Sequence, residues 1–226
     1  MKDRSKLPTW VILGACALAC IAGMVNVIGL LGFVHQGLTH LTGITTLLGA
    51  SIAQLQWRAV WEISAVILAF LAGCVLSGFI IQDDNVSLRR RYGVALAIES
   101  ALLFLAAALF REQDIKGALI AATAMGLQNA MATTYSGALV RTTHVSGLFT
   151  DVGIAIGHAL RGEPFQIKRV QLSVLTIGAF LFGSVTGAWL FQQLHYHALY
   201  VPAVWTGVVG VGYALYHHFI LQRKPA

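Results

Sequence analysis

Charged residues are scarce in this chain. Lys, Arg, Asp and Glu make up 11% of its 226 residues, whereas an ordinary soluble domain carries about 25%. Hydrophobic residues make up 57%, which is more apolar surface than a soluble globule of this size can bury. The composition therefore excludes a disordered chain, a nucleic-acid-binding domain and a typical cytosolic enzyme. It indicates an all-α, multi-pass membrane protein.

Cysteine is also rare, and the spacing of the cysteines matches no disulfide or metal-binding motif. Cys16, Cys20 and Cys74 all lie inside apolar runs and form no C-x-x-C pair, so they predict neither a disulfide framework nor a metal site. The chain also lacks a nucleophile elbow, an H-E-x-x-H motif, a phosphate-binding loop and a dinucleotide fingerprint. We therefore expect no catalytic residue, no cofactor and no metal, and we expect that the protein is not an enzyme.

Eight apolar runs divide the chain, and two of them are short. A membrane-spanning helix needs about 20 residues. Six runs have 19 residues or more, whereas the second and sixth have 14 and 16 and are rich in Thr and Gly. The first run is too long for a cleavable signal peptide, so we read it as a membrane helix that follows a cytoplasmic N-terminus. The runs are 10–34, 41–54, 59–81, 92–110, 115–133, 145–160, 170–191 and 199–221.

Three blocks of sequence recur in the same order. Segments 39–49 and 143–153 share Thr, His, Gly, Thr and Gly at an offset of 104 residues, and segments 69–75 and 179–185 match at an offset of 110. Upstream, the residues that match at an offset of 103 include one Asn in each copy. Chance similarity between apolar helices would give scattered Ala, Leu and Gly matches, so the blocks predict an internal duplication.

The predicted halves are 10–110 and 113–221, each with three long helices and one short polar helix. If the short helices dip into the membrane and return, six crossings make the halves inverted repeats. If they cross, eight crossings make the halves parallel. The positive-inside rule places 12 basic residues inside and 3 outside with six crossings, and 11 and 4 with eight. The three arginines at 89–91 and the short runs favour six crossings, with eight as the alternative.

Polar residues of the motif segments are candidates for a substrate pathway. In inverted-repeat transporters, broken helices meet near the bilayer midplane, and their N-terminal ends suit an anionic or carbonyl-bearing solute. Alternatively, amides in the membrane hydrogen-bond across helices, and hydroxyls bond back to their own helix. The predicted pathway residues are Asn26, His40, Thr42, Gly43, Thr46, Gln128, Asn129, His144, Ser146, Gly147, Thr150 and Asp151.

Four ionisable residues in apolar runs or at their edge are candidates for proton coupling. His144, Asp151 and His158 are seven residues apart, so they share one helix face, and Glu99 lies near the middle of its run. Ionisable side chains at membrane depth mark functional sites by default, and an Asp aligned with His suits proton transfer. The alternatives are a structural hydrogen-bonded set on the helix, and for Glu99 a bond to Arg141 or another interior donor.

Small residues predict where helices approach closely. Gly73-x-x-x-Ser77 and Gly183-x-x-x-Gly187 have the spacing that lets two helix backbones come together in a membrane. We expect the same of Gly14 and the alanines around it.

The motif segments resemble the YoaK-like family of bacterial membrane proteins, a domain of unknown function numbered 1275. The resemblance covers nearly the whole chain. It implies a bacterial inner-membrane protein and no established substrate. The family usually has Asp where Asn26 stands and Asn where Ile44 stands, which leaves Asp151 as the acidic candidate in this chain. The segments that carry the resemblance are 23–26, 40–49, 124–130 and 142–153.

Together these features predict a secondary transporter of a small solute, with a midplane site between the two repeats. The alternatives are a passive channel for a small solute and a non-transporting membrane sensor or assembly component. The expected partners are the lipid bilayer and the solute, without nucleic acid. A homo-oligomer is compatible with the sequence.

Overall fold

The computed structural model describes residues 9–32, 37–81, 88–110, 115–135, 142–165 and 167–216. Its regular elements are helical throughout these residues, and they follow the apolar runs closely because each run is a continuous, predominantly apolar stretch. The run at 145–160 coincides with its helix residue for residue. The elements are α1 (Thr9–Gly32), α2 (Leu41–Ala53), α3 (Trp57–Ile80), α4 (Leu88–Phe110), α5 (Ile115–Tyr135), α6 (Val145–Leu160), α7 (Ile167–Leu194), the 3₁₀ helix η1 (His195–Leu199) and α8 (Tyr200–Tyr216).

Four stretches within the described residues are long and apolar enough to cross a membrane. They are Ile12–Gly32, Trp57–Ile80, Arg91–Phe110 and Val170–Leu215, the last of which includes α7, η1 and α8. α5 has 21 residues, about 31 Å of helix, but it is more polar and packs between α3 and α4. α2 and α6 are shorter apolar helices.

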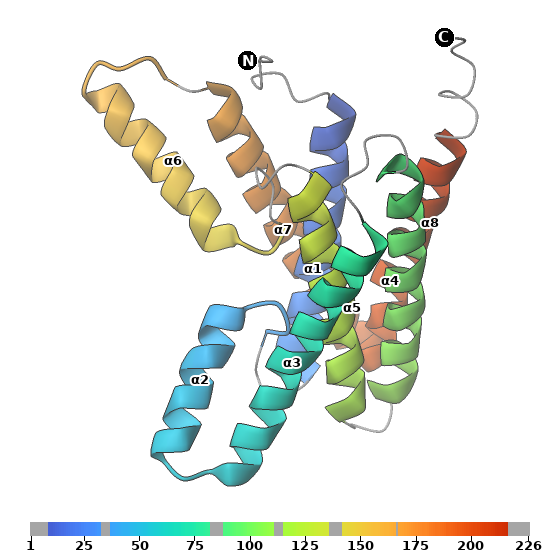
Figure 1. The fold of residues 1–226 in the computed structure, drawn as a ribbon. Coiled ribbons are helices and arrows are strands. Elements are labelled where there is room, and N and C mark those ends of the chain that lie inside the picture. The colour runs from blue at the N-terminus through green and yellow to red at the C-terminus, as the bar shows by residue number, and fades with distance from the viewer. Residues whose placement is uncertain are drawn as a thin grey trace.

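The two short helices stand apart from a central bundle. Figure 1 shows α2 and α6 beginning near the middle of the molecule and running toward opposite ends. α2 packs against α3, and α6 packs against α7. In the bundle, α1 packs along α7, α5 packs along α3, and α4 lies against both α5 and α8. Each short helix is therefore held mainly by the long helix that follows it.

Glycines bring the backbones of the paired long helices together. Small residues allow this close approach because a Cβ would occupy the space that the neighbouring backbone fills. The predicted contacts at Gly73 and Gly183 are confirmed. The prediction for Gly14 is wrong, because nothing lies within 4 Å of a Cβ built there, and Gly23 makes the contact on α1 instead. A Cβ at Gly23, Gly183, Gly73 or Gly126 would collide with the carbonyl oxygen of Phe180, Cys20, Thr123 or Phe70, respectively.

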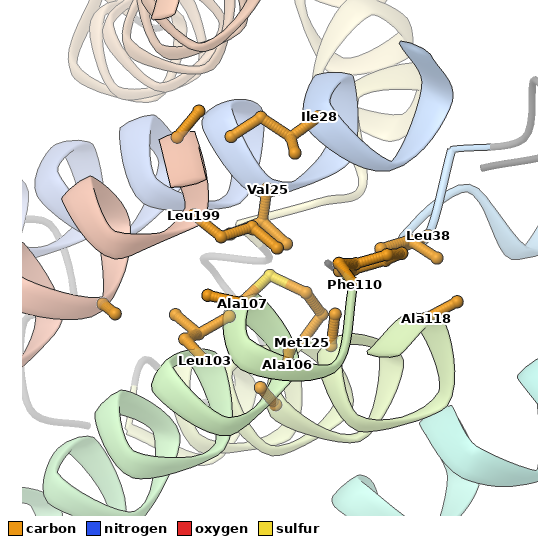
Figure 2. Close-up of a cluster of buried hydrophobic side chains, with 14 of the residues drawn as sticks. Val25, Ile28, Leu38, Leu103, Ala106, Ala107, Phe110, Ala118, Met125 and Leu199 are labelled. Atoms are coloured by element: carbon orange, nitrogen blue, oxygen red, sulfur yellow. The ribbon is translucent and has the colours of Figure 1, made fainter. Parts of the chain in front are cut away.

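A core of buried apolar side chains joins α1, α4 and α5. In Figure 2, Val25 and Ile28 of α1 face Leu103 of α4 and Met125 of α5. One end of this core is closed by η1. The hydroxyl of Tyr196 donates to the carbonyl oxygen of Gly32 at 2.7 Å, and its ring stacks on Phe110 with 5.4 Å between centroids. η1 therefore ties the end of α1 to the end of α4.

Candidate functional site

A cavity of about 410 Å³ lies where α2 and α6 begin. Its lining comes from α1 and α5, from the segments that lead into α2 and α6 together with the first turns of these helices, and from one aromatic ring on each of α3 and α7. Most of the lining residues occupy matching places in the two predicted halves. These pairs are Asn26 and Asn129, Thr39 and Thr143, His40 and His144, Leu41 and Val145, Thr42 and Ser146, and Phe70 and Phe180.

The two asparagines each hold the start of a short helix. Thr39 donates to Oδ1 of Asn26 from its backbone N–H at 3.0 Å and from its hydroxyl at 2.8 Å. In the same way, the hydroxyl of Thr143 donates to Oδ1 of Asn129 at 3.0 Å. Within the described part of the chain, neither Nδ2 group has a hydrogen-bond partner. Each amide therefore uses its oxygen to hold the segment before a short helix, while its NH₂ group makes no hydrogen bond to the described residues.

Two histidines lie across the first turns of the short helices. His40 and His144 are the N-cap residues of α2 and α6, and neither makes a side-chain capping hydrogen bond. A Cβ on Gly43 would lie 2.7 Å from Nδ1 of His40, and a Cβ on Gly147 would collide with the ring of His144. Glycine three residues after each histidine therefore makes room for the imidazole. The uncapped first-turn N–H groups give these helix ends a partial positive charge.

The cavity gathers only part of the predicted pathway. Thr46 and Thr150 turn away from it, because their hydroxyls donate to the carbonyl oxygens one turn earlier in their own helices, at 2.9 and 3.0 Å. Gln128 is fully buried in the bundle. Ile44, in the first turn of α2, packs in an apolar cluster. The predicted residues that line the cavity are Asn26, His40, Thr42, Asn129, His144 and Ser146, whereas Gly43, Thr46, Gln128, Gly147, Thr150 and Asp151 do not.

The predicted coupling residues of α6 extend along the helix. His144 lines the cavity, Asp151 is half-buried two turns further on, and His158 lies in the last turn. Nδ1 of His158 is 3.3 Å from a carboxyl oxygen of Glu163, and both side chains are about half exposed. Fourteen residues of helix separate the two histidines by about 21 Å. Arg141, the suggested partner of Glu99, lies outside the described residues.

Sequence reasoning missed eight of the lining residues, and four of these form two identical matching pairs. Thr39 and Thr143 position the asparagines, and Phe70 and Phe180 close the cavity from α3 and α7. The sequence did contain a signal for them, because Thr39 is identical to Thr143 and Phe70 to Phe180 in the matched blocks. Treating identical residues of the two blocks as candidates for one shared cavity would have found both pairs.

Replacing Gly147 by Ala should displace the His144 ring at little cost to the fold. The new Cβ meets an imidazole that can rotate, and Ala favours a helix by up to about 1 kcal/mol over Gly. We expect altered carbethoxylation of His144 by diethyl pyrocarbonate, measured by mass spectrometry, with His40 as the internal reference. Gly153→Ala is the control, because nothing lies within 4 Å of a Cβ at Gly153. Unchanged His144 reactivity in Gly147→Ala would contradict the observed packing.

The long apolar helices define the class of this molecule as a multi-pass helical membrane protein. The family model described as "Protein of unknown function (DUF1275)" matches residues 14–212, and the chain belongs to this family. This match confirms the resemblance seen in the motif segments. Neither the curated proteins nor the solved structures contain a match.

Proposed function

We propose that this protein is a secondary transporter of a small solute, and not an enzyme. The observation that carries the proposal is the cavity from which α2 and α6 run apart, lined by matching polar residues of both predicted halves. Its volume of about 410 Å³ is near the lower end of the range for small-molecule pockets. A site of this size between two broken helices is typical of secondary transporters.

The helix contacts support the proposal that the halves 10–110 and 113–221 are inverted repeats. Gly23 of α1 lies against Phe180 of α7, and at the matching positions Gly126 of α5 lies against Phe70 of α3. The opposite directions of α2 and α6 in Figure 1 agree with an inverted relation. Irregular backbone at membrane depth is tolerated where it borders a polar cavity, which fits the two segments before these helices.

The chemistry of the lining favours an anionic or carbonyl-bearing solute. Hydrogen-bond donors converge there from the two asparagine amides, from the hydroxyls of Thr42 and Ser146, and from the first turns of α2 and α6. No Asp or Glu lines the cavity among the residues that the structure describes. A cation would therefore find no charged ligand in it.

The ends of the bundle support six crossings with a cytoplasmic N-terminus. In Figure 1, the start of α1, the start of α4 and the turn between α6 and α7 lie at one end, while the turn between α2 and α3 lies at the other. Twelve of the 15 basic residues belong to the first end if the chain crosses six times. By the positive-inside rule, we assign that end to the cytoplasmic side of a bacterial inner membrane.

Ligand-induced stabilisation of the purified protein tests the binding site. The probes are formate, acetate, nitrate and phosphate as anions, and urea and acetamide as neutral carbonyl compounds. We expect at least one probe to raise the melting temperature, because a ligand at 100 times its Kd adds about 2.7 kcal/mol of stability. If no probe stabilises the wild type, the proposed site is wrong.

Substitution of the asparagines locates that binding. Asn26→Asp and Asn129→Asp keep an oxygen that accepts the bond from Thr39 or Thr143, but they replace the NH₂ donor with a negative oxygen. We expect unchanged unliganded stability and at least about tenfold weaker anion binding in each variant, since a hydrogen bond to a charged group contributes about 1.5–3 kcal/mol. Thr186→Ala is the control, because among the described residues its hydroxyl bonds only to the carbonyl oxygen of Phe182 within α7. Full binding in both Asp variants would place the ligand elsewhere.

Flux of the stabilising probe into proteoliposomes separates the three candidate functions. Saturable uptake that responds to a proton gradient supports the transporter. Linear uptake that is insensitive to the gradient identifies a channel. Binding without flux identifies a non-transporting membrane component.

A further inference from the structure

A carboxyl group without a partner lies in the centre of the bundle. Glu99 of α4 is 0% exposed, and among the described residues neither of its carboxyl oxygens has a hydrogen-bond partner. An isolated ionised carboxylate is very costly in such a place, because burial removes its hydration and nothing replaces it. Glu99 must therefore hold a proton or another cation.

A second buried oxygen without a partner belongs to Gln128 of α5. The side-chain NH₂ of Gln128 donates to the carbonyl oxygen of Leu18 at 2.8 Å and to the hydroxyl of Thr142 at 3.3 Å. These two bonds fix the orientation of the amide. Its oxygen, Oε1, is buried and has no hydrogen-bond partner among the described residues. This oxygen is therefore able to accept a proton donor.

The two groups lie at the same level of the bundle. α4 and α5 pack against each other in opposite directions. Leu96, just before Glu99, belongs to a buried cluster with Met131, and Leu103, just after it, belongs to a cluster with Met125. Position 128 lies between those two methionines on α5, so the glutamate and the glutamine lie between the same two clusters along their helices.

Described cations on the neighbouring helices are distant from Glu99. Gly117 contacts Phe110, which places Lys116 near the end of α4, about 16 Å along the helix from Glu99. Arg58 is 93% exposed and pairs with Glu62. The titratable or charged side chains described on α4 and on the elements packed around it are Arg91 and Tyr92 of α4, Lys116 of α5, Tyr200 and Tyr213 of α8, His195, Tyr196 and His197 of η1, Arg58, Glu62 and Cys74 of α3, and Cys16 and Cys20 of α1.

We propose that Glu99 and Gln128 form a proton-binding site in the membrane interior. A proton joins one carboxylate oxygen of Glu99, and the resulting O–H donates to Oε1 of Gln128. One proton then satisfies both unpartnered groups, and no existing hydrogen bond is broken. Loss of the proton leaves two acceptors facing each other, which pushes the two side chains apart.

Gln128 and its hydrogen-bond partner Thr142 are each adjacent in sequence to a residue that lines the cavity. Gln128 precedes Asn129 in α5, and Thr142, which accepts a bond from Gln128, precedes Thr143. Asn129 and Thr143 both line the cavity and bond to each other. A shift of Gln128 on deprotonation therefore reaches the cavity. As a coupling site this inference rests on the proposed transport function, whereas proton binding itself does not.

Infrared difference spectroscopy of the full chain in nanodiscs, between acidic and alkaline pH, tests the inference. We expect the carbonyl-stretching band of a neutral carboxylic acid in the wild type, shifted in ²H₂O. Glu99→Gln should abolish it, and Glu99→Asp should move it. Gln128→Met, which removes the acceptor, should also move the band. Glu62→Gln and Asp151→Asn are matched controls that should retain it.

Three infrared results would contradict this inference. A band that survives Glu99→Gln, a band that disappears in Asp151→Asn, or no such band at any pH would overturn the assignment to Glu99. If sodium chloride in place of choline chloride abolishes the band at constant pH, the site binds a metal cation and not only a proton. Glu99→Asp keeps the test decisive if Glu99→Gln does not fold. Because no solute is present, failure here leaves the transporter proposal untouched, and absence of transport leaves this site untouched.

Discussion

Cysteines placed at Arg58 and at Arg161 should react with a membrane-impermeant maleimide from opposite sides of the bilayer. The two arginines flank the α2–α3 and α6–α7 turns, which lie at opposite ends of the molecule in Figure 1. Their side chains are 93% and 78% exposed, so neither substitution disturbs packing. In intact cells we expect labelling of Arg58→Cys, and labelling of Arg161→Cys only after the inner membrane is permeabilised.

The experiment needs a background without native thiols. Cys16 and Cys20 are replaced by Ala, and Cys74 by Ser, which retains a donor toward the carbonyl oxygen of Gly126. Glu163→Cys serves as a second reporter beside Arg161. Labelling of all three reporters from one side would mean that α2 and α6 cross the membrane. The halves would then be parallel, with eight crossings.

Replacing Gly183 or Gly73 by Ala should destabilise the bundle strongly. At each position the new methyl group collides with a backbone carbonyl of the partner helix, which cannot rotate away as a side chain can. Overpacking of this kind costs about 1–3 kcal/mol. We expect two similar losses, because the α1–α7 and α3–α5 contacts use glycines in matching places. Thermal unfolding in the same detergent measures both.

Controls for this prediction lie on the same helices. Gly178 of α7 and Gly78 of α3 have nothing within 4 Å of an added Cβ, so Ala there should be neutral or stabilise by up to about 1 kcal/mol through helix propensity. Equal melting temperatures for Gly183→Ala and Gly178→Ala would show that the close backbone contact is absent. Very different losses at Gly183 and Gly73 would argue against an equivalent role for the two contacts.

Hydropathy predicted the helices well because membrane helices are long apolar runs by necessity. Helix α6 was predicted residue for residue, and the others to within a few residues. The spacing of small residues also predicted the contacts at Gly73 and Gly183. It failed at Gly14, because spacing alone does not say which face of a helix meets a neighbour. On α1 that face contains Gly23.

Prediction of the cavity was weaker, because it depends on how individual side chains turn. A threonine in a helix can present its hydroxyl outward or bond to its own backbone, and Thr46 and Thr150 both bond back. Gln128 and Asn129 are neighbours, so they point about 100° apart on α5. Only Asn129 faces the cavity. Helix geometry would have excluded Gln128 from the cavity if the face of α5 that meets the cavity had been identified first.

For the proposed transporter, the packing of α1 on α7 and of α5 on α3 predicts which helices move together. Since α6 packs on α7 and α2 on α3, one packed unit consists of α1, α6 and α7, and the other of α2, α3 and α5. Each unit combines helices of both predicted halves. Asn26 then belongs to the first unit and Thr39 to the second, while Asn129 and Thr143 have the reverse assignment. The two Asn–Thr hydrogen bonds therefore join the two packed units at the cavity, and in the proposed transport cycle we expect them to break and re-form as the units move.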